Sequence, residues 1–407
     1  MTASWTAHSP GLLDTLAEQP LDPMLALLHM LRNDPRPGKL DLGIGVYRDE
    51  DGRTPVMRVV KQAEQILVDS QASKDYLSPE GDPDFVGAMA PLVLGPRAGD
   101  ARLWGMQTPG GTGALRLAAA LVARTNPEAR VWLGTPTWTN HKMLMQAAGL
   151  AVAEHPFFDQ ARQTVQFDDM MAALKQARPG DAIVLHAGCH NPTGAALTRD
   201  QWHIVSHFLD DRGVVPIVDM AYQGLGTGLE DDAWALRHIL DHVPEALVAV
   251  SCSKNFGLYR DRTGCLWVQG MSPGSVRRAR ANLNLIARVL WSMPPDHGAS
   301  VVRTILQSSE LAAQWRDELD VIRRRIGAMR RGLAVAVPQF CAAAGQEGMF
   351  SLLPLTRDDV IGLRTRHGIY MLESGRINMA GLSPATLPAF AAAVQSCLNR
   401  QKKTRHE

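Results

Sequence analysis

The sequence predicts an α/β fold in which a mostly parallel sheet lies between helices. Four short segments are apolar throughout rather than alternating, as strands buried on both faces of a sheet are. They span residues 129–134, 181–187, 213–222 and 246–251. Amphipathic segments with helical spacing lie between them. After Pro295 this alternation ends, and a different pattern predicts a second, smaller α+β unit.

In chain order, the first helices of the larger unit are expected at 113–125, with a start near Thr112, and at 199–213. Gly213 ends the second of these, as glycine commonly does at a helix C-terminus. Residues 263–270 follow the last apolar segment so closely that we expect an antiparallel return strand.

The smaller unit is expected to begin with one long amphipathic helix over 308–337, followed by short strands near 348–355 and 375–381. The N-terminal residues are expected to join it. The predicted organisation is an N-terminal arm and part of the small domain at 1–53, a large cofactor-binding domain at 54–307, the small domain with its linking helix at 308–400, and a tail at 401–407.

The composition is that of an ordinary soluble protein: 407 residues, 45% hydrophobic and 20% charged, with a formal net charge of +1. A near-neutral balance gives no electrostatic reason to expect nucleic acid or an anionic membrane as a partner. No apolar run approaches the roughly 18–20 residues of a membrane span, and no signal peptide is evident. The five cysteines lack paired metal spacing and indicate reduced thiols. We therefore expect a cytoplasmic protein.

Unusual polar residues follow the predicted strands. Lys254 comes directly after the apolar run at 246–251, although lysine is rarely buried without a partner. Trp138 and Asn191 follow two other strands, and Asp219 lies at the end of a third. In an open parallel sheet, ligands bind outside the carboxyl ends of the strands. These side chains are therefore expected to converge on one crevice.

Taken singly, each feature also has a purely structural explanation. The glycines of "PGGTG" (109–113) can form a tight turn, and Trp138 can belong to the core. Asp219 can cap a helix or form a structural ion pair. A metal site at His186, Cys189 and His190 would have a spacing that matches no strong zinc pattern.

Taken together, the residues describe the needs of one cofactor. Glycines before a helix, with Ser251 and Arg262, suit a phosphate, because helix N-terminal amides attract anions. Trp138 suits a planar ring, and Asp219 suits a ring cation, because a lone buried carboxylate is costly. Asn191 and Tyr222 can hydrogen-bond a ring oxygen, and Lys254 can supply an amine. Pyridoxal phosphate has all of these features.

Nine ordered motifs resemble those of the aspartate/aromatic aminotransferases, within which the segment around Met293 is most similar to the bacterial aromatic members. The motifs lie at 41–56, 74–81, 107–116, 137–142, 190–194, 219–224, 253–262, 294–302 and 374–381. This resemblance implies a fold-type I pyridoxal-phosphate transferase: a mostly parallel seven-stranded sheet between helices, and a smaller α+β domain built from both termini. It also implies a homodimer with shared active sites.

By this resemblance, Lys254 holds the cofactor covalently and shuttles protons, with Asp219 and Tyr222 as further catalytic residues. Asp219 faces the pyridinium nitrogen, Asn191 and Tyr222 bind the phenolic oxygen, and Trp138 stacks on the ring. The residues implied at the phosphate are Gly111, Thr112, Ser251 and Arg262, together with Tyr76 from the partner subunit.

For the substrate, the resemblance implies that Arg376 grips the α-carboxylate, since its bidentate guanidinium matches a carboxylate. Asn191, Trp138 and the backbone at Gly45 assist it. Arg288 is implied to reach across the dimer to a distal carboxylate. No metal is expected.

The expected reaction is transamination of tyrosine, phenylalanine and possibly tryptophan with 2-oxoglutarate/glutamate, with residual aspartate activity. Met293, beside Trp291, departs from the asparagine of aspartate-type members and favours aromatic substrates. The alternative is an aspartate aminotransferase proper, which is favoured by four residues of that type: Val46, Arg48, Thr54 and Thr112.

Three other functions fit less well. Arg288 argues against β-decarboxylation of aspartate. A cofactor-binding regulator would carry a DNA-binding domain, but only about forty residues precede the first motif. A dehydrogenase would need G-x-G-x-x-G after its first strand.

Overall fold

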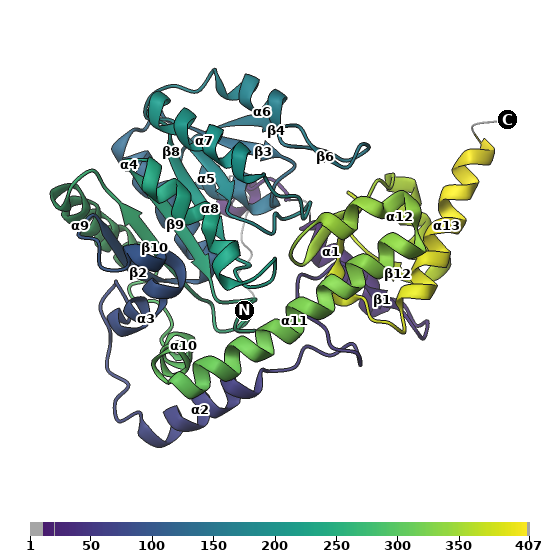
Figure 1. Cartoon of the computed structure of the whole chain (residues 1–407), viewed down its shortest axis with the longest axis horizontal. Coiled ribbons are helices and arrows are strands. Elements are labelled where there is room, and N and C mark those ends of the chain that lie inside the picture. The colour runs from purple at the N-terminus through teal and green to yellow at the C-terminus, as the bar shows by residue number, and fades with distance from the viewer. Residues whose placement is uncertain (1–10, 20, 405–407) are drawn as a thin grey trace, which may run out of the picture.

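The computed structural model describes residues 11–19 and 21–404. Its main feature is a seven-stranded sheet (Figure 1). In spatial order the strands are β2 (Leu103–Pro109), β10 (Thr263–Gln269), β9 (Ala246–Ser251), β8 (Val215–Met220), β7 (Ala182–His186), β3 (Arg130–Thr135) and β4 (Ala151–Pro156). Strand β10 runs in the direction opposite to the other six strands. The predicted mostly parallel sheet and the antiparallel return strand are both confirmed.

Helices cover both faces of the sheet, which explains why its central strands are apolar throughout. One face packs against α4 (Gly110–Thr125), α5 (Thr139–Ala147) and α9 (Pro273–Leu290). The other packs against α3 (Pro83–Leu94), α6 (Phe167–Leu174), α7 (Arg199–Arg212) and α8 (Leu229–His242). Neighbouring residues of one strand enter different cores: Ile217 joins the first, and Val218 joins the second.

The predicted helix ends are close to the observed ones. Gly213 adopts the left-handed conformation that ends α7. The expected helix start near Thr112 is wrong by two residues, because α4 begins at Gly110. Such shifts are common, since the first residues of a helix have no intrahelical partner for their N–H groups.

The smaller unit is built from both ends of the chain, as predicted. The long helix α11 (Ser309–Ala336) connects it to α10 (His297–Gln307) and α2 (Arg58–Ser70) (Figure 1). Its other helices are α1 (Pro23–Asn33), α12 (Arg357–His367) and α13 (Leu387–Thr404). Two small sheets complete it: β1 (Leu40–Asp41) pairs with β12 (Ile369–Tyr370), and β11 (Phe350–Leu352) pairs with β13 (Arg376–Asn378).

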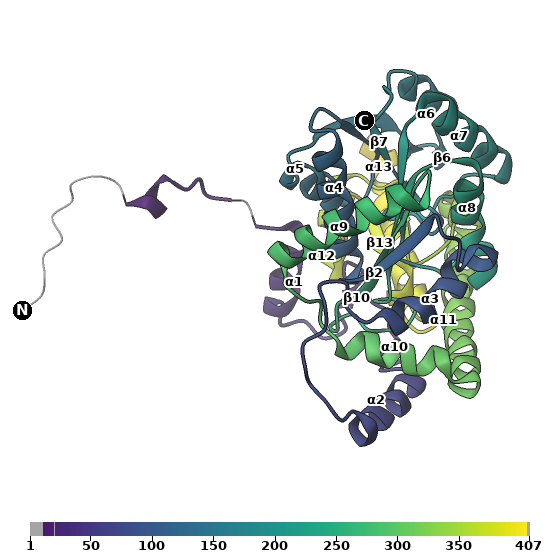
Figure 2. The same cartoon turned by 90° about the vertical axis from the view of Figure 1, so that its left-hand side faces the viewer.

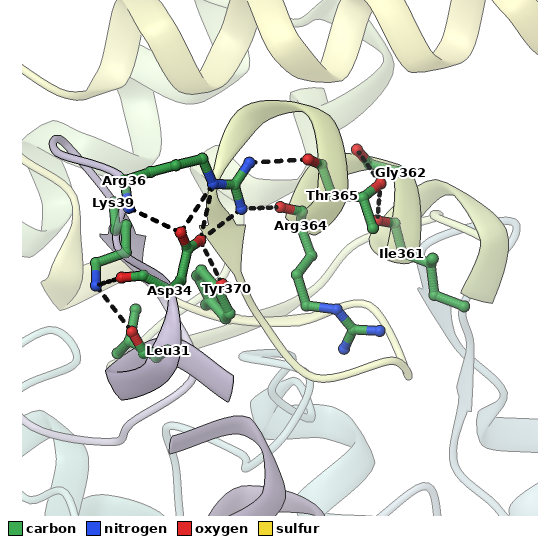
Figure 3. Close-up of polar contacts among 9 residues, drawn as sticks. All are labelled: Leu31, Asp34, Arg36, Lys39, Ile361, Gly362, Arg364, Thr365 and Tyr370. Atoms are coloured by element: carbon green, nitrogen blue, oxygen red, sulfur yellow. Dashed lines mark hydrogen bonds and ion pairs between the residues drawn. The ribbon is translucent and has the colours of Figure 1, made fainter. Parts of the chain in front are cut away.

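A polar cluster fastens the N-terminal part of this unit to its C-terminal part. Figure 3 shows Asp34 between Arg36 and Tyr370. The Tyr370 hydroxyl donates to Asp34 Oδ2 at 2.6 Å. The guanidinium of Arg36 also donates to the carbonyls of Arg364 and Thr365, at 2.9 and 2.8 Å. These bonds fasten the segment that precedes β1 to α12 and β12.

The described ends of the chain differ from expectation in one respect. The tail expected from residue 401 is helical as far as Thr404, and residues 405–407 lie outside the described residues. Of the expected N-terminal arm, residues 1–10 and 20 also lie outside them. Residues 11–19 extend from the rest of the fold (Figure 2), and three leucines there are exposed: Leu12, Leu13 and Leu16.

Within the described residues, none of the helices combines the length and the apolar character that a membrane crossing requires. The remaining short elements are η1 (Leu12–Thr15), η2 (Gly95–Arg97), β5 (Phe158–Asp159), β6 (Thr164–Val165), η3 (Pro338–Gly345) and η4 (Met379–Gly381).

Candidate active site

A cavity of about 260 Å³ lies at the carboxyl ends of the parallel strands. It is lined by all the predicted site residues except Tyr76 and Arg288: Gly45, Gly111, Thr112, Trp138, Asn191, Asp219, Tyr222, Ser251, Lys254, Arg262 and Arg376. The smaller unit contributes Arg376 from β13 and Phe350 from β11. The expected convergence on one crevice is therefore observed.

Lys254 follows β9 and points its ammonium nitrogen over an aromatic ring. Its Nζ lies 4.7 Å from the centre of the Tyr222 ring. Burial lowers the pKa of Lys254 to about 8; Asp219 opposes this shift and Arg262 adds to it. At neutral pH a much larger fraction of this amine is therefore unprotonated than in an ordinary lysine, and only the unprotonated amine is a nucleophile.

Asp219 is buried at the end of β8 and is bound by a histidine. Nε2 of His141 donates to Oδ2 of Asp219 at 3.0 Å, and Nδ1 of His141 lies 2.8 Å from Oγ1 of Thr137. Burial alone raises the pKa of Asp219, but the hydrogen bond from His141 and nearby positive charge outweigh it, so the pKa falls below its ordinary value. Asp219 is thus a fixed anion that can face a cation in the cavity.

His141 was not identified from the sequence as a site residue. It does lie within the motif at 137–142, in the first turn of α5, three residues after Trp138. The two rings meet edge to face at 5.3 Å.

Three buried polar side chains form a chain across the cavity. Arg376 Nη1 donates to Asn191 Oδ1 at 3.4 Å, and Asn191 Nδ2 donates to the Tyr222 hydroxyl at 3.5 Å. Burial, with the negative charge of Asp219, raises the pKa of Tyr222. The phenol is therefore protonated at neutral pH and can donate a hydrogen bond.

Arg376 is buried without a carboxylate partner among the described residues. Its Nη2 donates to the Gly43 carbonyl at 2.7 Å, its guanidinium lies 4.5 Å from the centre of the Phe350 ring, and its Nε has no partner. Burial lowers the pKa of Arg376. A buried guanidinium is costly unless an anion pairs with it, so this side chain provides a place for a carboxylate.

The opposite end of the cavity suits a phosphate. Gly111 and Thr112 lie in the first turn of the sixteen-residue helix α4, whose N-terminal amides attract anions. Arg262 Nη1 donates to Ser253 Oγ at 3.3 Å and to the Tyr259 carbonyl at 3.1 Å. None of the carboxylates in the described part of the chain forms an ion pair with Arg262.

At the phosphate end of the cavity, the backbone of two glycines lies close to neighbouring side chains. Gly110 has a φ of +68°, and a Cβ there would lie 2.9 Å from Nη2 of Arg262. At Gly111, a Cβ would lie 3.1 Å from the Cβ of Ser251. With an anion site at one end, Asp219 and an aromatic wall in the middle, and a free amine on Lys254, the residues present fit pyridoxal phosphate.

Tyr76 and Arg288 lie outside this cavity. Tyr76 is 95% exposed, and Arg288 is exposed near the end of α9. Met293 lies near Tyr76, since its sulfur accepts from the Leu77 N–H at 2.9 Å. Within a single chain, these residues do not complete the site.

The histidines considered as metal ligands belong to the same region. His186 lies close enough to His141 and Asp219 for the three to share an ion. However, both ring nitrogens of His141 already form hydrogen bonds. Burial lowers the pKa of His186 to about 3, and its ring packs 4.1 Å from His190, which fits a neutral packed ring. Cys189 is a buried free thiol.

Comparison with known proteins agrees with this geometry. The family model described as aminotransferase class I and II matches residues 37–394. A tyrosine aminotransferase of Rhizobium meliloti is 51% identical over 389 residues, which cover 95% of this chain and all of that protein. An aspartate aminotransferase of Escherichia coli is 40% identical, with 95% of this chain and all of that protein covered.

Among solved structures, an aromatic-amino-acid aminotransferase from Burkholderia pseudomallei, covalently bound to pyridoxal phosphate, superposes with a TM-score of 0.93. It is 38% identical to this chain, and the match covers 95% of this chain and all of that one. The family match spans both the sheet and the smaller unit that together enclose the cavity. The chain belongs to the class I and II aminotransferase family.

Proposed function

We propose that this chain transaminates aromatic amino acids, tyrosine and phenylalanine foremost, with 2-oxoglutarate/glutamate as the amino-group partner and with residual activity on aspartate. The observation that carries transamination is the buried guanidinium of Arg376, which has no carboxylate partner among the described residues, in one cavity with Lys254 and Asp219. The relatives named tyrosine and aromatic-amino-acid aminotransferases, at 42–51% identity, support the aromatic preference.

The cofactor of the reaction is pyridoxal phosphate, which supplies an electron sink for the negative charge that develops at the substrate α-carbon. Lys254 holds the cofactor covalently and, when released, moves the proton at the α-carbon as a general base. Asp219, held by His141, keeps a proton on the ring nitrogen. Tyr222 and Asn191 bind the ring oxygen, and Trp138 covers one face of the ring.

Two further groups of residues bind the phosphate of the cofactor and the α-carboxylate of the substrate. Gly111, Thr112, Ser251 and Arg262 bind the phosphate. Arg376 binds the α-carboxylate that every amino-acid and 2-oxo-acid substrate carries, with Asn191, Trp138 and the backbone of Gly45 beside it. Because this contact is common to all substrates, it fixes orientation and does not select the side chain.

A homodimer with shared active sites accounts for the residues left outside the cavity. Tyr76 would complete the phosphate site of the partner, and Arg288 would reach its distal carboxylate site. The extended segment at 11–19, with its exposed leucines, supports contact with a second chain. Lys254→Ala and Arg288→Ala chains, each defective with aspartate, are expected to regain aspartate activity in hybrid dimers when they are refolded together; a fully active monomer would count against shared sites.

Aspartate aminotransferase activity is the second candidate. The relatives of that name at 40% identity favour it, and so does the use of Arg288 for a distal carboxylate. A neutral ring can occupy the same space when that arginine turns away. Met293 and Trp291 then offer apolar contact, which is why we place aromatic substrates first.

The test is a single-turnover titration of the purified holoenzyme with tyrosine, phenylalanine and aspartate, followed by the absorbance of the bound cofactor. Tyrosine and phenylalanine are expected to react with the higher kcat/KM. Lys254→Ala is expected to abolish both turnover and covalent attachment of the cofactor. Faster reaction with aspartate would favour the second candidate, and persisting turnover in Lys254→Ala would refute the role of the lysine.

A further inference from the structure

A cluster of histidines lies between two helices on the outer part of the sheet domain, and none of them lines the active-site cavity. Helices α7 and α8 pack side by side (Figures 1 and 2). Each carries a pair of histidines four residues apart, which places both members of a pair on one helix face. The pairs are His203 with His207 on α7 and His238 with His242 on α8.

Three of these rings meet closely. One ring nitrogen from each of His203, His238 and His242 lies within 4.8 Å of the other two. The ring centres of His203 and His238 are 4.3 Å apart, and those of His238 and His242 are 4.0 Å apart. His207 is the next neighbour, with its ring centre 5.9 Å from that of His242.

Hydrogen bonds fix which nitrogens carry the protons. Nδ1 of His242 must donate to the carbonyl of His238, 2.8 Å away, which leaves the lone pair on Nε2. The Ser206 hydroxyl donates to the carbonyl of His203, so Nε2 of His238 must donate to Ser206 Oγ at 3.0 Å. This leaves the lone pair of His238 on Nδ1. Outer hydrogen bonds of this kind orient histidines that ligate metals.

The central ring, His238, is buried and held in one plane. Its ring also stacks on Trp234, with centres 5.0 Å apart and planes 6° apart. A neutral, fixed imidazole is the form that binds a metal ion.

We propose that His203, His238 and His242 bind a divalent transition-metal ion, with Zn²⁺ as the representative probe. Three imidazole nitrogens suit zinc, copper or nickel rather than magnesium or calcium, which prefer oxygen ligands. Bonds of roughly 2.1 Å at tetrahedral angles require nitrogens about 3.4 Å apart. His203 is exposed, so rotation of its side chain can close the remaining gap. Water or His207 would supply a fourth ligand.

The test is isothermal titration of untagged, chelator-treated holoenzyme with zinc chloride at pH 7.5, in a buffer that does not bind zinc. We expect one saturable site per chain that His203→Gln and His242→Gln each weaken at least ten-fold. His29→Gln, an exposed histidine on α1, is the matched control and should bind as the wild type does. Bound Co²⁺ should show visible absorption bands that the two cluster variants lose.

Thermal unfolding without metal verifies that the variants fold, and added zinc should raise the Tm of the wild type but not of either cluster variant. His238→Asn is a third variant, used only if it keeps the wild-type Tm. The absence of a saturable site below millimolar zinc would overturn the proposal. So would wild-type affinity in both His203→Gln and His242→Gln, because zinc would then be bound elsewhere.

Discussion

Nε2 of His141 lies 3.0 Å from Oδ2 of Asp219, and both residues are buried. A hydrogen bond to a charged group contributes about 1.5–3 kcal/mol. We therefore expect His141→Ala to lower kcat/KM by about ten-fold or more. Because the lost bond holds the pKa of Asp219 down, the acid limb of the pH–rate profile should also move to higher pH. His297→Ala, at an exposed histidine, is the control, and an unshifted profile in His141→Ala would contradict this role.

The depressed pKa of Lys254 predicts how cofactor uptake depends on pH. Protonation blocks the amine below its pKa, so the rate at which apoenzyme takes up pyridoxal phosphate should rise with pH around a midpoint near 8. Asp219 raises this pKa, so Asp219→Asn should shift the midpoint to lower pH. Stopped-flow absorbance measures both. A midpoint near that of an ordinary lysine, roughly 10.4, would contradict the buried environment.

Gly110→Ala should weaken cofactor binding through Arg262. The new Cβ would lie 2.9 Å from Nη2 of Arg262, so this guanidinium must move away from the phosphate site. Gly149→Ala is a matched control, since Gly149 also has a positive φ, +85°, but nothing lies within 4 Å of the new Cβ. Equilibrium titration of the apoenzymes should show a raised Kd only in Gly110→Ala. Equal Kd values in the two variants would exclude this account.

Arg288 and Met293 should favour different substrates: Arg288 the acidic ones and Met293 the aromatic ones. Removing one partner of a desolvated charge pair costs about 2–5 kcal/mol, so Arg288→Ala should lower kcat/KM for aspartate by roughly thirty-fold or more. Phenylalanine and tyrosine should lose much less. Met293→Asn should weaken the aromatic substrates, because a thioether contacts a ring and an amide does so poorly. Equal losses for acidic and aromatic substrates in Arg288→Ala would mean that this arginine is structural.

The sequence predicted the central strands well because burial on both faces makes them apolar throughout. It did not predict β4, one of the two edge strands, whose residues alternate irregularly between exposed and buried positions. The two-residue strands β1 and β12 were also beyond prediction, because pairing between segments more than 300 residues apart creates them.

Contacts between segments far apart in the sequence also limited the prediction of the site. Residues that directly follow strands, such as Lys254 and Asn191, could be found because strand ends are visible in the sequence. The contact of His141 with Asp219 joins residues 78 positions apart and depends on which strands become neighbours. The histidine pairs on α7 and α8 have visible spacing, but only the packing of the two helices brings them together.

Strand β10 runs against its neighbours, so it starts at the edge where β9 ends. A single hairpin loop, residues 252–262, therefore carries both Lys254, the proposed attachment point of the cofactor, and Arg262, a proposed phosphate ligand. A circular permutant with new termini at Gly257 would leave every strand of the sheet intact, yet it would place these two attachments at opposite ends of the polypeptide. Such a permutant would be expected to fold and to bind the cofactor more weakly. Exchange of the whole loop between relatives would instead transfer both residues together.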